Sequence, residues 1–110
     1  MEKKLEEMID KFNKRIEKDE KLKKNLEGIE RKIMLVITDG DTYNFELRDL
    51  KLSPLAKGEI PDADVTITTD TETMTGLLDG TIKPMKAYAT KKIKFKASVR
   101  AMLLLKKLLS

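Results

Sequence analysis

Two short segments on either side of residue 40 constrain the fold of this chain most strongly. Residues 33–38 are rich in aliphatic and β-branched side chains, and residues 42–48 alternate apolar with polar side chains. Asp39 and Gly40 stand between them as a dipeptide that favours a tight hairpin turn. The sequence therefore predicts an antiparallel hairpin. Because the first segment has apolar side chains on both faces, it is expected to be a central strand covered on each side.

The remaining elements are predicted from periodicity and from helix-capping residues. Asp19, Asp70 and Ser98 are expected N-caps, whereas Gly28 and Gly80 are expected to end two helices. Helices are thus predicted near residues 2–17, 20–27, 71–79, 84–89 and 99–109, with further strands at 50–55, 65–69 and 92–96. This order indicates an α+β fold: a mixed, mostly antiparallel sheet of about five strands covered by about five helices.

The composition is that of one folded domain spanning residues 1–110, with 40% hydrophobic and 38% charged residues. Cysteine and histidine are both absent, which removes thiolate chemistry and the commonest general base. No nucleophile elbow, phosphate-binding glycine loop or calcium loop occurs, so we expect no catalysis, no metal and no cofactor. Without an apolar run of about 18 residues or a signal peptide, the expected location is the cytoplasm.

Charge is distributed unevenly along the chain. Residues 81–110 contain nine Lys or Arg and no Asp or Glu, whereas residues 1–80 contain 14 basic and 19 acidic side chains. Such asymmetry indicates an anionic partner for the basic end. The predicted helix at residues 99–109 has a wide apolar face, so this end combines positive charge with surplus apolar surface. Together these features suggest a protein that handles apolar molecules near anionic surfaces.

The stretch Ala63–Leu105 resembles the type-2 sterol carrier protein domain. The resemblance rests on three segments: Ala63-Asp-Val-Thr-Ile-Thr-Thr-Asp, Leu77-Leu-Asp-Gly-Thr-Ile-Lys-Pro-Met-Lys-Ala-Tyr, and Lys92-Ile-Lys-Phe-Lys. The family has an acidic residue and a β-branched strand, a helix ending in Thr-Gly-Lys, an Asn-Pro turn, a short helix containing an aromatic residue, and a lysine-rich strand before the final helix. This chain departs from it at four positions, Thr90, Lys91, Ala97 and Arg100; glycine is usual at the second and third, where ordinary backbone angles are expected to suffice.

The resemblance implies a lipid carrier without enzymatic activity, which holds a sterol, fatty acid, fatty acyl-CoA or phospholipid in an apolar cavity between sheet and helices. The expected ligand-binding residues are Met74, Leu77, Leu78, Met85, Tyr88, Phe95, Met102 and Leu105. The residues expected to contact a headgroup or an anionic membrane are Lys92, Lys94, Lys96 and Arg100. The last helix would serve as a lid.

Each of these residues also has an ordinary structural interpretation. Taken singly, each apolar residue fits an ordinary core position, and the lysines fit a solvated face that aids solubility. Nucleic-acid binding ranks third, because the basic strand lacks the aromatic side chains on which bases stack. The rival from a different class is a protein-interaction or homodimerisation module that uses the apolar C-terminal helix and binds no small ligand.

Overall fold

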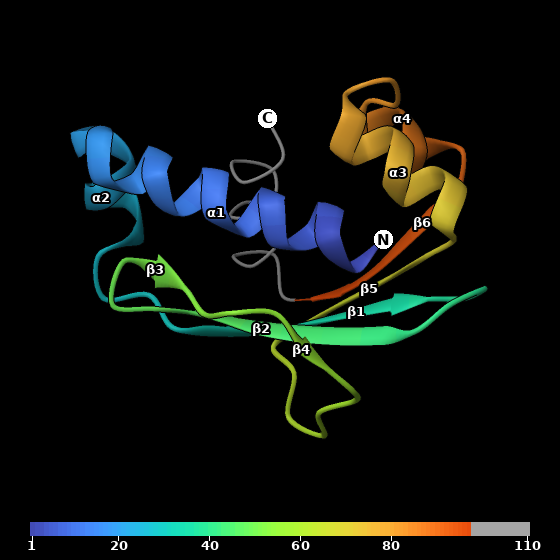
Figure 1. Cartoon of the computed structure of the whole chain (residues 1–110), viewed down its shortest axis with the longest axis horizontal. Helices are drawn as coiled ribbons and strands as arrows, with labels where there is room; N and C mark the ends of the chain where they lie inside the picture. Colours follow the sequence, from blue (N-terminus) through green and yellow to red (C-terminus); the bar gives the residue numbers. More distant parts are fainter. Residues whose placement is uncertain (98–110) are drawn as a thin grey trace.

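A computed structural model describes residues 1–97, which form four helices and six strands (Figure 1). The helices are α1 (Glu2–Lys18), α2 (Glu20–Leu26), α3 (Thr71–Asp79) and α4 (Pro84–Ala89). The strands are β1 (Arg31–Ile37), β2 (Thr42–Arg48), β3 (Lys51–Leu52), β4 (Ala56–Lys57), β5 (Val65–Thr69) and β6 (Ile93–Ala97). The predicted last helix and its N-cap Ser98 lie outside the described residues.

All six strands belong to one open sheet in the order β3-β2-β1-β5-β6, with β4 also paired to β2. β1 and β5 are parallel, and every other pair is antiparallel. Across the sheet, Leu35 lies opposite Tyr43 on one side and Ile67 on the other, and Ile67 lies opposite Phe95. The predicted hairpin, the central position of its first strand and the α+β class with a mixed sheet are confirmed.

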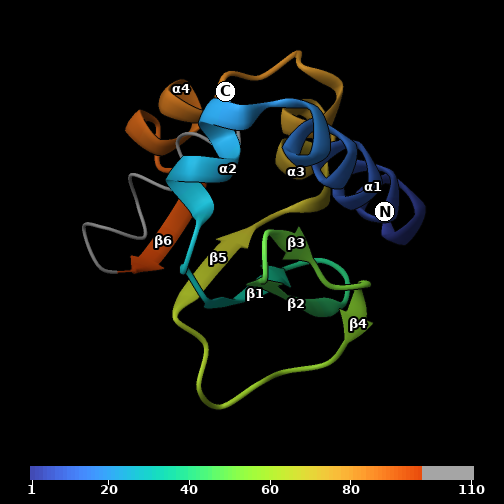
Figure 2. The same ribbon diagram turned by 90° about the vertical axis from the view of Figure 1, so that its left-hand side faces the viewer.

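The core lies between this sheet and the helices, which all cover the same face (Figures 1 and 2). Alternate side chains of β1, β2 and β5 point into it, as period-two patterning requires. The helix α1 adds a stripe of four buried side chains at helical spacing. That stripe consists of Leu5, Ile9, Phe12 and Ile16.

The expectation that β1 is covered on both faces is wrong. Met34 and Val36, on its outer face, are only half-buried, and the helices are all on the other side. The loop between β4 and β5 instead lies over the outer face, so that Ile60 and Pro61 border a pocket together with Met34. Half-buried apolar side chains such as Met34 and Val36 are common at protein surfaces, so this face does not require a layer of helices.

The weak strand predicted at residues 50–55, interrupted by Ser53-Pro54, is present only as the edge strand β3, and the chain pairs again as β4 beyond the predicted range. Pro54 lies between them and has no backbone N–H to donate to a ladder. Ser53 reinforces the junction: its N–H donates to the Glu46 carbonyl at 2.8 Å, and its Oγ accepts from the Glu46 N–H at 2.8 Å. After this break the chain pairs with β2 again, with Lys57 opposite Tyr43.

The predicted caps Asp19, Asp70 and Gly80 are confirmed, whereas α2 ends at Leu26 with Glu27 as its C-cap, before the predicted Gly28. The Asp19 carboxylate accepts from the Leu22 N–H at 3.1 Å at the start of α2, and the Asp70 carboxylate accepts from the Thr73 N–H at 2.7 Å at the start of α3. Gly80 ends α3 with φ of 80°, a left-handed conformation that favours glycine. These local rules fix where α2 begins and where α3 begins and ends.

Asn13 links α1 to the short strand β3. Its Nδ2 donates to the Leu52 carbonyl at 3.0 Å, and its Oδ1 accepts from the Leu52 N–H at 2.7 Å. Replacing Asn13 with alanine is expected to lower the free energy of unfolding by about 1–3 kcal/mol, because both backbone groups of a buried residue lose their partner. Urea unfolding checks this. Lys11→Ala, two positions away and exposed, is the control and should change stability by less than about 0.5 kcal/mol; an Asn13→Ala effect that small would contradict the prediction.

Candidate functional site

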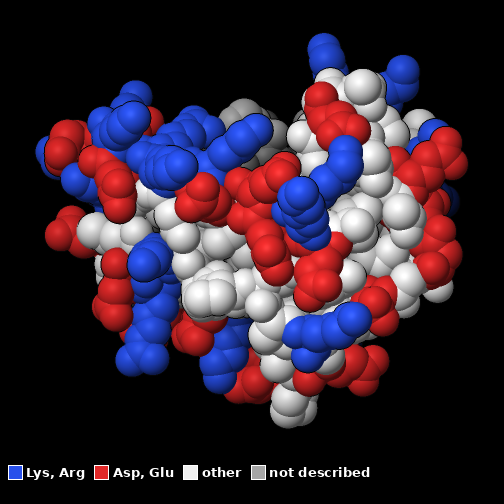
Figure 3. All heavy atoms as spheres, viewed as in Figure 1, with Lys and Arg blue, Asp and Glu red and all other residues white. Residues whose placement is uncertain are grey.

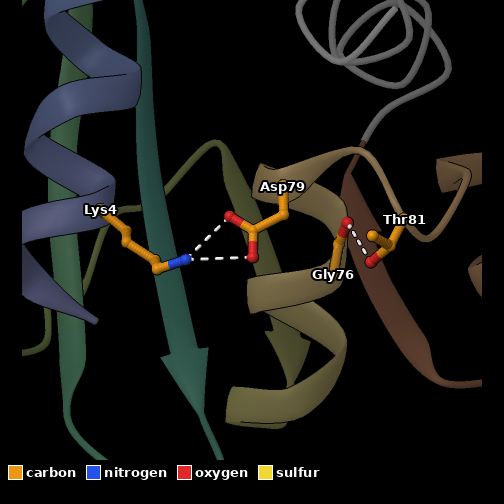
Figure 4. Close-up of polar contacts among 4 residues, drawn as sticks. All are labelled: Lys4, Gly76, Asp79 and Thr81. Carbon is orange, nitrogen blue, oxygen red and sulfur yellow. Dashed lines mark hydrogen bonds and ion pairs between the residues drawn. The ribbon is translucent and has the colours of Figure 1, made fainter.

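The predicted site residues within 1–97 come from α3, α4 and β6, and several contacts hold these elements in place. At the start of α3, the N–H and the hydroxyl of Thr71 both donate to Oδ1 of Asp39 at 2.8 Å. These two bonds lower the pKa of Asp39 below its usual value. At the other end of the helix, Nζ of Lys4 pairs with Asp79, at 2.8 Å from Oδ1 and 3.0 Å from Oδ2 (Figure 4). The helix α3 is therefore tied to the β1–β2 turn and to α1.

A tight connection between α3 and α4 is organised by Gly76. Its carbonyl accepts from the N–H groups of Thr81 and Ile82 at 2.9 and 3.0 Å, and from the Thr81 hydroxyl at 3.3 Å (Figure 4). The Ile82 side chain packs so closely on this glycine that an added Cβ would lie 2.6 Å from Cγ1 of Ile82. Only glycine therefore fits here without displacing the connection that positions α4.

The helix α4 is joined to β6 by a second set of backbone contacts. The Lys92 N–H donates to the Ala87 carbonyl at 2.9 Å, and the Thr69 hydroxyl donates to the Lys92 carbonyl at 2.9 Å. Between them, Lys91 has φ of 60°, in the left-handed region. The expectation that ordinary backbone angles suffice at Lys91 is therefore wrong. A lysine in this left-handed conformation, where glycine is usual in the family, costs about 1–2 kcal/mol of stability. Ala97, the other such departure, lies in regular strand opposite Val65.

The structure brings part of the predicted ligand-binding set together. Met74 is buried, and Leu77, Leu78 and Phe95 are half-buried and pack against the same apolar core. The rings of Tyr88 and Phe95 are in contact, with centroids 5.7 Å apart and planes inclined at 40°. These side chains form an apolar region where α3 and α4 meet β6. Met102, Leu105 and Arg100 lie outside the described residues.

The predicted apolar side of α4 is wrong. Met85 and Tyr88 are 62% and 46% exposed and Ala89 is exposed, whereas Ala87 is 1% exposed and forms the buried side. A methyl group at Ala87 lets the helix approach the protein closely, which leaves the larger side chains outside. Sequence periodicity could not assign the buried face, because a helix of six residues has fewer than two turns.

Lys94 and Lys96 belong to β6, whereas Lys92 precedes the strand. Lys94 and Lys96 are exposed on the outer face of the sheet, opposite Thr68 and Thr66, and so lie on the side away from the helices. Lys92 is exposed at the end of the α4–β6 turn. The alternation of lysine and apolar side chains predicted for this strand is confirmed, but it puts Lys94 and Lys96 on the face opposite Phe95.

A pocket of about 440 Å³ opens on that outer face, beneath the loop between β4 and β5. It is lined by Met34, Ile60, Pro61, Ala63, Asp64, Thr66, Lys96 and Ala97. No periodic signal in the sequence pointed to it, because one wall is irregular loop.

Hydrogen bonds pin that loop to β1 and β2. The Lys32 N–H donates to Oδ2 of Asp64 at 2.7 Å, and the Asp64 N–H donates to the Lys32 carbonyl at 2.8 Å. Nζ of Lys32 also pairs with the Asp62 carboxylate, which raises the pKa of Lys32 and lowers that of Asp62 through their hydrogen bond. At the start of the loop, the side-chain amide of Asn44 donates to the Gly58 carbonyl at 3.0 Å. The loop is therefore anchored at both ends.

The fold and the site together define a class of protein: a small α+β domain with all described helices on one face of a mixed sheet, and an apolar region bounded by a lysine-rich edge strand. The model of the SCP-2 sterol transfer family matches residues 9–110, and the chain belongs to this family. Its domain is typically a lipid-binding, non-catalytic fold. No curated protein matches the sequence.

Solved structures agree on the fold. Sterol carrier protein 2 from Aedes aegypti, determined in complex with the C16 fatty acid palmitate, is similar at 22% identity, with a TM-score of 0.65 over 97% of this chain and 94% of that one. UbiJ-SCP2, a ubiquinone synthesis protein, is similar at 9% identity and a TM-score of 0.70, over 96% and 89%. The alkylsulfatase Pisa1 from a Pseudomonas species is similar at 19% identity and a TM-score of 0.64; 79% of this chain aligns, over only 14% of that enzyme. Within residues 1–97, no helix is long and apolar enough to cross a bilayer.

Proposed function

We propose that this protein is a non-enzymatic carrier whose ligand is a long-chain fatty acid or its acyl-CoA, held between the sheet and the later helices. The observation behind the proposal is the family match over residues 9–110, which makes lipid binding the general expectation. The palmitate complex of the Aedes aegypti protein supports a fatty-acid tail as the ligand. The half-buried side chains of Leu77, Leu78 and Phe95, together with the Tyr88 ring, supply apolar surface suited to an alkyl chain.

Titration with a fluorescent fatty acid tests this function, with the protein first stripped of co-purified lipid. We expect saturable binding at micromolar protein and displacement by unlabelled palmitate. Phe95→Glu should weaken binding at least about tenfold, because a carboxylate in an apolar region opposes the alkyl chain. Thr68→Glu, which adds the same charge to the outer face of the neighbouring strand, is the matched control and should bind normally. Circular dichroism establishes that both variants fold.

Two results would overturn this proposal. One is the absence of saturable, palmitate-displaceable binding by the wild-type protein. The other is a tight dimer in sedimentation experiments with no lipid extractable by organic solvent, which favours the rival protein-interaction module.

Contact with an anionic membrane during lipid delivery is also part of the proposal. It rests on residues 81–110, which contain nine basic side chains and no acidic one. Lysines close to an anionic bilayer are attracted by about 1 kcal/mol each. The cytoplasmic location remains a prediction from the sequence.

A further inference from the structure

The outward side of α4 combines exposed apolar and basic side chains. Met85 and Tyr88 are the two large hydrophobic residues most exposed in the described part of the chain, at 62% and 46%. Lys83, Lys86 and Lys91, before, within and after this helix, are exposed as well. We call these five residues the α4 surface. It lies at the periphery of the molecule, above β6 and on the far side of α3 from β4 (Figures 1 and 2).

The α4 surface has no acidic residues near it in sequence. Residues 81–97 contain six lysines and no Asp or Glu, and none of those lysines forms an ion pair within residues 1–97. Residues 98–110 contribute no acidic side chain either. Elsewhere the surface mixes charges, and in the view of Figure 3 the basic side chains over α1 and α2 are interspersed with acidic ones. Uncompensated positive charge is therefore concentrated at this end.

The exposed apolar side chains distinguish the α4 surface from an ordinary solvated lysine face. Successive helical residues are about 100° apart, so Met85 lies nearly opposite the buried Ala87, whereas Tyr88 lies on the flank between them. The Tyr88 ring leans against Phe95, which limits its freedom. Methionine and tyrosine between lysines are the composition of helices that lie in a membrane interface, where apolar parts enter the acyl boundary and ammonium groups stay among the headgroups.

We propose that the α4 surface is the docking site of this protein on an anionic lipid bilayer, with Met85 inserted at the interface. This inference builds on the proposed lipid-carrier function and specifies where the carrier meets its membrane. The lysines supply charge complementarity to anionic headgroups, and Met85 and Tyr88 supply the apolar contact. Because Tyr88 also touches Phe95, the docking surface adjoins the region proposed to hold the alkyl chain.

The outer face of the sheet is the alternative surface and fits a bilayer less well. Lys94 and Lys96 project from it, but Lys96 shares its pocket with the Asp64 carboxylate. Its larger apolar side chains, Met34 and Val36, are half-buried rather than exposed. Lys86 and Lys91 on the α4 surface can therefore be compared directly with Lys94 and Lys96 on the outer face of the sheet.

Vesicle co-sedimentation of the full chain separates the two surfaces. Lys86→Glu with Lys91→Glu, and Lys94→Glu with Lys96→Glu, change net charge equally. The first pair is expected to lower partition onto phosphatidylcholine vesicles containing phosphatidylserine at least about tenfold, and the second less than about threefold. Neither protein should bind pure phosphatidylcholine strongly. Equal losses in the two pairs, or no loss in the first, would overturn the assignment of the α4 surface.

Fluorescence reports insertion directly, because the chain contains no tryptophan. A Met85→Trp variant is expected to show a blue-shifted emission maximum when the anionic vesicles are added. Thr68→Trp, on the outer face of the sheet, is the control and should not shift. A Met85→Trp protein that sediments with vesicles and keeps an unshifted spectrum would contradict insertion. Both measurements are made without fatty acid, so failure of docking is distinguishable from failure of lipid binding.

Discussion

Replacing Leu47 with alanine is expected to lower the free energy of unfolding by about 2–5 kcal/mol. Leu47 is 0% exposed, in a strand paired on both sides, so alanine would lose apolar contacts and leave a cavity that rigid neighbours cannot fill. A domain of this size has a total stability of only about 5–15 kcal/mol. The variant should therefore unfold at a much lower urea concentration than the wild-type protein, measured by circular dichroism after lipid removal.

The adjacent residue provides the control for that experiment. Arg48 points to the opposite face of β2 and is exposed, and its ion-pair contacts within residues 1–97 are long, at 3.7 Å with Glu30 and 3.8 Å with Asp49. Such exposed pairs contribute little, so Arg48→Ala should change stability by less than about 1 kcal/mol. Similar losses at the two positions would mean that the alternation of β2 is not as described.

Replacing Gly76 with valine is expected to cost about 3 kcal/mol of stability, the upper end of the usual cost of overpacking. Even the added Cβ would lie 2.6 Å from Cγ1 of Ile82 and 3.2 Å from its Cβ, and valine adds two further methyl groups. Relief requires Ile82 to move, and its N–H is bonded to the Gly76 carbonyl. The measurement is again urea unfolding of the lipid-free protein.

A double-mutant cycle shows whether this steric conflict is the cause. Ile82→Ala by itself removes apolar contacts and should destabilise the protein. In the Ile82→Ala background, however, Gly76→Val should cost at least about 1 kcal/mol less than in the wild-type background, because most of the conflicting atoms are gone. Additive effects would show instead that valine acts through the intrinsic helix preference of position 76. The same cycle can be followed by vesicle binding, since this connection positions α4.

The strand β6 presents apolar side chains on one face of the sheet and lysines on the other. Ile93 and Phe95 face the helices, whereas Lys94 and Lys96 face outward, which is the alternation of a half-buried strand. The alkyl chain that we propose for the inner side would thus be separated from the outer lysines by the sheet itself. For this reason the proposed docking surface lies at α4, on the same side of the sheet as the proposed ligand, rather than at the outward lysines.

For the expected site residues, the sequence predicted which side chains face the core in some elements and not in others. Met74 and Phe95 pack in or against the core, as the clear periodicity of their elements predicted. Met85 and Tyr88 were misassigned, since one and a half turns of helix give no reliable apolar face and the exposed side is set by how closely Ala87 approaches its neighbours. The outer-face pocket was missed because it depends on a loop.

What the sequence determined by itself was local: the hairpin at Gly40, the caps Asp19 and Asp70, the helix end at Gly80 and the lysine row of β6. Each follows from residue types within a few positions of one another, where periodicity, capping and turn chemistry act. Only the tertiary structure decided that the helices cover one face of the sheet and that α4 turns its larger side chains outward. It also decided that the loop after β4 folds back over the outer face. These features depend on packing between segments far apart in the chain, which no local pattern encodes.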